Sequence, residues 1–130
     1  MPFIRIDMIE GRSDDELKKL LDTIQSVVVE AFDVPETDRY QIVHEHKPGR
    51  MVLLDTGLGF ERTDQMVSIQ VDTSPREHDE KMKLYKLLAE RLESECGIAQ
   101  TDLLISLFSN TQEDWSFANG EAQYVTGRLP

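Results

Sequence analysis

An internal repeat constrains the fold of this chain more than any other feature of the sequence. When the sequence is shifted by 64 positions, Val34–Asp38 aligns with Ile98–Asp102, and Arg12 aligns with Arg76. Each half therefore predicts a strand, a helix, a turn containing Thr-Asp and a second strand. Such a unit is a βαβ motif, in which a helical crossover joins two parallel strands. Apolar residues at helical spacing coincide as well: Leu20 with Leu84, Ile24 with Leu88, and Val28 with Leu92.

The two halves, about 1–64 and 65–130, predict a single α+β domain. Two βαβ units form a four-stranded sheet with both helices on one face. The expected helices span 13–32 and 74–95, and the expected strands span 2–7, 39–46, 66–71 and 101–108.

One face of that sheet has no helix to cover it. The strand at 101–108 is apolar almost throughout, a pattern that predicts burial on both faces. A domain of this size cannot cover its own open face, so we expect the chain to form an oligomer.

Charge and composition limit the partners. The net charge of −11 argues against binding to nucleic acid or to an anionic membrane surface. No apolar run approaches the roughly 20 residues that a membrane span needs. Cys96 is the only cysteine, which excludes an internal disulfide and fits a reducing cytoplasm, where we expect the protein. An anionic small molecule would have to be held by local arginines.

The first residues suggest a reactive amine. Pro2 follows the initiator Met1, which is normally removed before proline, and it begins a strand in which Ile4 and Ile6 share one face. Processing would leave a secondary amine that titrates somewhat above the roughly 7.7 to 8.0 of ordinary chain termini. An amine fixed by a strand can act as an acid, a base or a nucleophile. The simpler alternative is that Pro2 only blocks a strand edge.

Two further patterns are weaker. His44 and His46 share a strand face and could bind a metal with a nearby carboxylate, but no third ligand has a convincing spacing. We therefore expect a polar strand face and no metal site. Gly57-Leu58-Gly59 lacks the third glycine and the context of a dinucleotide-binding loop.

These features together resemble the tautomerase superfamily, and within it the malonate semialdehyde decarboxylase family. The segments that carry the resemblance span nearly the whole chain: Pro2, Ile9–Arg12, Val34–His44, Asp55–Phe60 and Asp114–Phe117. The resemblance implies a homotrimer in which three sheets face one another as a barrel with the helices outside. It also implies a site around each amino-terminal proline, near a subunit boundary.

The resemblance also implies roles for individual residues. Pro2 would be the catalytic amine and Asp38 its partner, whereas Trp115 and Phe117 would form an apolar wall. Arginines at the start of the second helix would hold the substrate carboxylate. The family pattern has two arginines there, two residues apart; Arg76 matches the second, and Ser74 stands in place of the first.

The expected reaction is the decarboxylation of a small β-oxo acid, with malonate semialdehyde giving acetaldehyde and carbon dioxide, without a cofactor. A protonated Pro2 would stabilise the enolate charge, and an ionised Asp38 would raise the pKa of Pro2. Arg76 would orient the carboxylate. A side hydratase activity and an imine at Pro2 remain open, as does the reading of Asp38 as a turn residue like its repeat partner Asp102.

Two alternatives of other kinds accompany this expectation. A keto-enol tautomerase of an enolpyruvate would use a neutral Pro2 as a base, so a nearby carboxylate would be unhelpful. A non-catalytic trimeric binding protein could keep the same fold.

Overall fold

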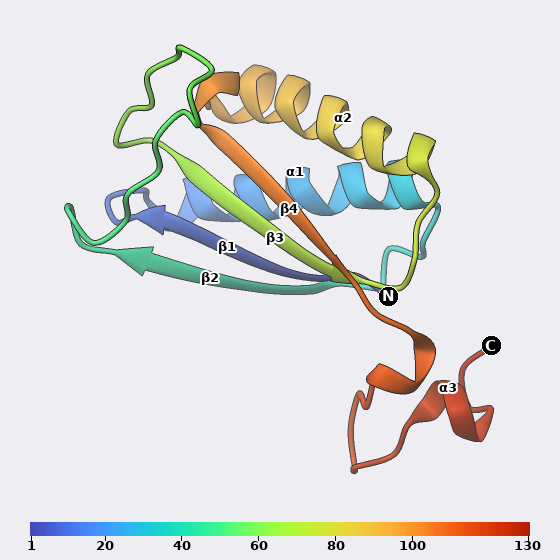
Figure 1. The fold of residues 1–130 in the computed structure, drawn as a ribbon. Helices are drawn as coiled ribbons and strands as arrows, with labels where there is room; N and C mark the ends of the chain where they lie inside the picture. The colour runs from blue at the N-terminus through green and yellow to red at the C-terminus, as the bar shows by residue number, and fades with distance from the viewer.

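The computed structural model describes residues 1–130 and contains one four-stranded sheet backed by two long helices (Figure 1). The strand order is β2-β1-β3-β4. The strands pair in parallel within each half, and β1 and β3 join the halves in antiparallel fashion. This topology confirms the tandem βαβ repeat and the α+β class. The strands are β1 (Phe3–Ile9), β2 (Tyr40–His46), β3 (Val67–Thr73) and β4 (Leu103–Ser109); the long helices are α1 (Asp14–Phe32) and α2 (His78–Cys96).

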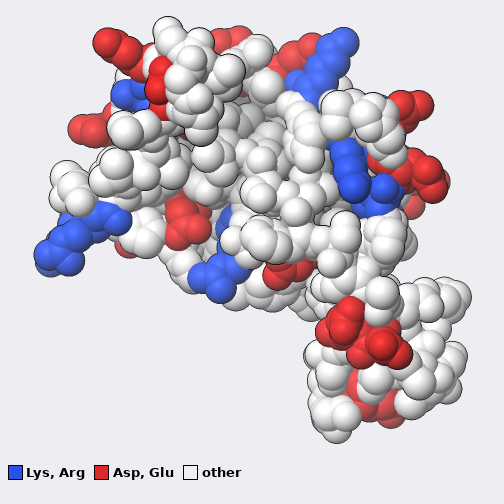
Figure 2. Space-filling view, in the orientation of Figure 1, with Lys and Arg blue, Asp and Glu red and all other residues white.

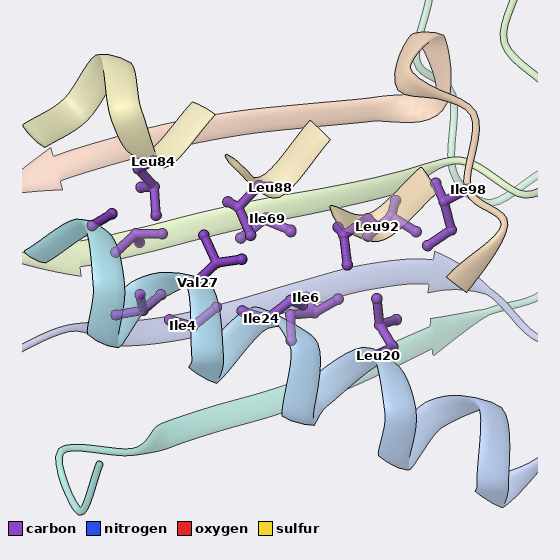
Figure 3. Close-up of a cluster of buried hydrophobic side chains, with 14 of the residues drawn as sticks. Ile4, Ile6, Leu20, Ile24, Val27, Ile69, Leu84, Leu88, Leu92 and Ile98 are labelled. Atoms are coloured by element: carbon purple, nitrogen blue, oxygen red, sulfur yellow. The ribbon is translucent and has the colours of Figure 1, made fainter. Parts of the chain in front are cut away.

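The hydrophobic core lies between the sheet and the two helices (Figure 3). Both halves contribute to it, because strand residues at alternate positions meet helix residues at helical spacing. Ile4, Ile6 and Ile69 point from the central strands toward Ile24 on α1 and Leu88 on α2, and all five are almost completely buried. The central strands and the helices therefore hold the end of β1 in a fixed position.

Helix α1 begins as predicted. The Ser13 hydroxyl accepts a hydrogen bond from the backbone N–H of Glu16 at 3.2 Å, and the Glu16 carboxylate accepts one from the Ser13 N–H at 2.9 Å. This reciprocal pair is the predicted capping box.

Helix α2 begins at His78, so the predicted start at residue 74 is wrong. Ser74 precedes Pro75, and the residue before a proline is disfavoured in helical conformation. The Glu80 carboxylate instead accepts a hydrogen bond from the backbone N–H of Glu77 at 2.9 Å and stabilises the later start. As a consequence, Arg76 lies in the connection between β3 and α2 rather than on the helix.

Strand β4 is an edge strand, and the prediction that it is buried on both faces is wrong for the single chain. Its apolar residues are only partly covered, and Phe108 remains 53% exposed. The face of the sheet opposite the helices is turned toward the viewer in Figure 2. The middle of that face carries few charged side chains. The open face that the sequence predicted is present.

The segment after β4 leaves the sheet as an arm (Figure 1). It contains two short turns of helix, η2 (Gln112–Asp114) and α3 (Gln123–Thr126); a third, η1 (Gln100–Asp102), immediately precedes β4. The arm returns the carboxyl terminus to the neighbourhood of the amino terminus. None of the helices combines the length and apolar character that crossing a membrane requires.

Candidate active site

The amino-terminal end of β1 lies where the sheet, the turn before β2, the β3–α2 connection and the carboxy-terminal arm come together (Figure 1). A cavity of about 420 Å³ opens there. Its lining comes from the amino terminus, the start of β2 and the arm: Met1, Asp38, Tyr40, Phe117, Ala118, Asn119, Gln123, Arg128 and Leu129. Residues from the two ends of the chain therefore share one site.

The chain amine is held in a mixed electrostatic environment. The amino group of Met1 lies 3.4 Å from the Ser74 hydroxyl, and Pro2 beneath it is buried. Burial lowers the pKa of the Met1 amine, the charge of Arg76 lowers it further, and the charge of Asp38 opposes both. Asp38 and Arg76 therefore act on the pKa of the amine in opposite directions, and burial is the largest influence while Met1 is present.

Asp38 is positioned by backbone contacts, which leave its carboxylate free. Its backbone N–H donates to the Pro35 carbonyl at 3.0 Å. The buried side chain of Gln25 on α1 donates to the carbonyls of Glu36 and Asp38, both at 3.1 Å. The half-buried carboxylate makes no hydrogen bond within the chain and borders the cavity. Gln25 is a positioning residue that sequence reasoning missed, because it occupies an ordinary helical position.

Arg76 is anchored beside the site. Its Nε donates to the Thr73 hydroxyl at 3.0 Å, and its Nη1 lies 3.4 Å from the Phe32 carbonyl. The guanidinium also lies 4.7 Å from the centre of the Phe32 ring, a cation–π distance. These contacts fix the cation near the amine, although Arg76 does not line the cavity itself.

An aromatic cluster forms one wall of the cavity. Phe117 is at its centre and stacks on Tyr40 at 5.7 Å and on Trp115 at 5.4 Å between ring centroids. Tyr124 meets the edge of Phe117 at 5.7 Å, and burial raises the pKa of its phenol, with the charge of Asp38 adding to the effect. Phe117 therefore lines the cavity, whereas Trp115 stacks on Phe117 outside the lining and donates to the Asn110 side chain at 2.8 Å.

Two other segments singled out in the sequence lie elsewhere. Asp55 closes the loop between β2 and β3 by accepting from the N–H groups of Gly57 and Gly59, at the far end of the sheet from the amino terminus (Figure 1). His44 and His46 face Asp7 on the open sheet face, and His46 Nε2 lies 2.7 Å from its carboxylate. No group of three or more His, Cys, Asp or Glu side chains is arranged to hold a metal ion.

Comparison with known proteins agrees with this architecture. Two family models described as tautomerase enzyme match residues 38–118 and residues 2–61. A probable tautomerase of Bacillus subtilis, YrdN, is 59% identical over 99% of this chain and 100% of its own length. A second, YusQ, is 36% identical over 96% of this chain and 99% of its own length. The chain belongs to the tautomerase family of enzymes.

The structure is also similar to solved structures of tautomerase-fold proteins. A malonate semialdehyde decarboxylase, described with decarboxylase and hydratase activities, is 44% identical and superposes with a TM-score of 0.95, covering 98% of this chain and 99% of that one. A second malonate semialdehyde decarboxylase, FG41, is 37% identical with a TM-score of 0.92, covering 98% and 97%. A fused 4-OT that forms a symmetric trimer is 20% identical with a TM-score of 0.78, covering 97% and 99%, and shares the fold.

Proposed function

We propose that this protein decarboxylates a small β-oxo acid, with malonate semialdehyde as the expected substrate and acetaldehyde and carbon dioxide as products. The observation that carries the proposal is a cavity that the chain amine shares with Asp38 and Phe117, within the electrostatic influence of Arg76. The likeness over nearly the whole chain to two malonate semialdehyde decarboxylases supports it.

Removal of Met1 transfers the amine to Pro2, one residue deeper in the same strand end. In its protonated form the Pro2 amine stabilises the negative charge that develops on the substrate carbonyl oxygen as carbon dioxide leaves. Asp38 favours this protonated form because an opposite charge nearby raises the pKa of an amine. No cofactor is required, since the carbonyl of the substrate itself accepts the electron pair.

Arg76 and the aromatic wall act on the other end of the substrate. The fixed guanidinium orients the carboxylate. Phe117, backed by Trp115 and Tyr40, offers an apolar surface that favours loss of charge from that carboxylate. Addition of water instead of loss of carbon dioxide would give the hydratase activity, with Asp38 positioning the water.

We further propose that the protein is a homotrimer with its open sheet faces turned inward. The exposed residues of β4 and the small number of charged side chains in the middle of the open face support this arrangement (Figure 2). Equilibrium sedimentation should give about three times the chain mass of 14.9 kDa. A stable monomer at micromolar concentration would contradict it.

A keto-enol tautomerase is the second candidate, favoured by the lowered pKa of the Met1 amine. If burial and Arg76 also dominate at Pro2, they favour the neutral amine, which is the form that acts as a base. Assays with malonate semialdehyde and with an enolpyruvate distinguish the decarboxylase from the tautomerase.

The test uses full-length protein whose loss of Met1 is verified by intact mass. Malonate semialdehyde should yield acetaldehyde, measured with a coupled alcohol dehydrogenase. Pro2→Ala, which keeps a primary amine of different basicity and shape, should lower turnover by about a hundredfold. Rapid ketonisation of an enolpyruvate without acetaldehyde release would favour the tautomerase. Inactivity of the processed protein in both assays would favour the non-catalytic binding protein.

A further inference from the structure

The candidate site has few positively charged groups with which to bind an anionic ligand. Its ligand is anionic under the proposed function, whereas the chain carries a net charge of −11. Ser74, which lies beside the amine, has no charge to offer. Arg76 already directs its Nε and Nη1 to Thr73 and Phe32, so it holds the carboxylate with only part of its donor set.

Arg128 is the one arginine that lines the cavity. It is also the only basic residue in the arm after β4, where Glu113, Asp114 and Glu121 are the acids. Figure 2 shows acidic and no basic side chains on the visible face of the arm. The single cation of an acidic segment therefore stands at the cavity.

The backbone under Arg128 is fixed, while its guanidinium is not. Gly127 adopts a left-handed conformation at φ 86°, and the backbone N–H of Leu129 donates to the Gln123 carbonyl at 3.1 Å. The Arg128 side chain is 70% exposed, and its only ion-pair partner is Glu121, at 3.5 Å. Nearly all of its donors can therefore turn to a ligand.

We propose that Arg128 is a substrate-binding residue that supplies the second cationic contact for the carboxylate of an oxo acid, from the arm side of the cavity, where Ser74 cannot. This inference rests on the proposed function, because that function defines the ligand as a small carboxylate. Arg128 and Arg76 hold the carboxylate from two sides, and the planar fork of Arg128 suits bidentate binding. Binding draws Arg128 away from Glu121.

The test measures binding apart from turnover. Malonate, which lacks the reactive aldehyde, is titrated into processed full-length protein by calorimetry. Arg128→Gln should raise the Kd of malonate about tenfold. The same variant should raise KM for malonate semialdehyde by a similar factor and change kcat by less than about twofold. Arg128→Lys should fall between the two, because it keeps the charge and loses the fork.

Two matched variants control for charge. Arg50→Gln removes an equal charge from the exposed turn after β2 and should leave the Kd unchanged. Glu121→Gln frees Arg128 and should leave malonate binding equal or tighter. Added salt should weaken binding to the wild type more than to Arg128→Gln.

The outcomes separate this inference from the proposed function. Binding that depends on Arg128, without acetaldehyde formation, would reject the decarboxylase and retain the role of Arg128. An Arg128→Gln variant that binds malonate within about twofold of the wild type would overturn the role of Arg128, whatever the activity. Absence of saturable malonate binding to the wild type would overturn it as well.

Discussion

Asp38 and Asp102 occupy the same position in the two halves and have different surroundings. Both follow the same turn: the Asp38 N–H donates to the Pro35 carbonyl at 3.0 Å, and the Asp102 N–H donates to the Ala99 carbonyl at 2.9 Å. Asp102 is 1% exposed, and its carboxylate accepts two hydrogen bonds of 2.6 Å, from the backbone N–H and the hydroxyl of Thr63. The Asp38 carboxylate has no such partner and borders a cavity.

The same contrast holds for the repeated arginines. Arg12 donates to the Gln65 carbonyl at 2.7 Å, whereas Arg76 lies beside the amine of Met1. Thr63 and Gln65 connect Asp102 of the second half with Arg12 of the first half through hydrogen bonds. Near Asp38 of the first half and Arg76 of the second half, the amine of Met1 and the cavity take that place. The same turn therefore holds a buried structural aspartate at Asp102 and a cavity-lining aspartate at Asp38. The segment packed against each turn accounts for the difference.

The largest expected effect comes from replacing Asp102, the buried aspartate of the pair. Asp102→Ala removes a buried carboxylate and the two hydrogen bonds that it accepts from Thr63, so the free energy of unfolding should fall by about 3 kcal/mol. Asp38→Ala, the matched control, should change it by no more than about 0.5 kcal/mol. Urea denaturation measures both. Equal losses for the two variants would mean that the halves do not differ as described.

The next effect concerns Asp38, whose replacement should lower activity and leave stability unchanged. Asp38→Asn keeps the turn but removes the charge that favours the protonated amine. The kcat/KM for malonate semialdehyde should fall by roughly tenfold or more, which corresponds to about 1.4 kcal/mol. The stability of this variant should stay close to that of the wild type. An unaltered kcat/KM would show that Asp38 is only a turn residue without a role in catalysis.

Much of the fold could be predicted because the repeat and the helical spacing are local signals. The capping box at Ser13 follows from residues three apart, and the two parallel strand pairs follow from the repeated pattern. The start of α2 was misplaced because the restriction that Pro75 imposes on Ser74 outweighed the helical pattern. The edge position of β4 depends on pairing between distant strands, which apolar content alone does not encode.

The candidate site was predictable only in part. Pro2 was indicated by its place at the start of a strand, and the roles of Asp38 and Arg76 came from the family resemblance; the charges of both act on the amine of Met1. Gln25 and Arg128 could not be found in this way. The contact of Gln25 with the Asp38 turn crosses between elements, and Arg128 follows a segment without periodicity, so its approach to the cavity exists only in three dimensions.

The most direct measurement of the central claim is an NMR titration of ¹⁵N-labelled Pro2 in the processed protein. The account predicts a pKa for Pro2 above the roughly 7.7 to 8.0 of an ordinary terminus. Asp38→Asn should lower that pKa by about one unit, and Asp102→Asn should leave it unchanged. A Pro2 amine that titrates well below neutrality, or a pKa that is indifferent to Asp38→Asn, would contradict the account and favour the tautomerase.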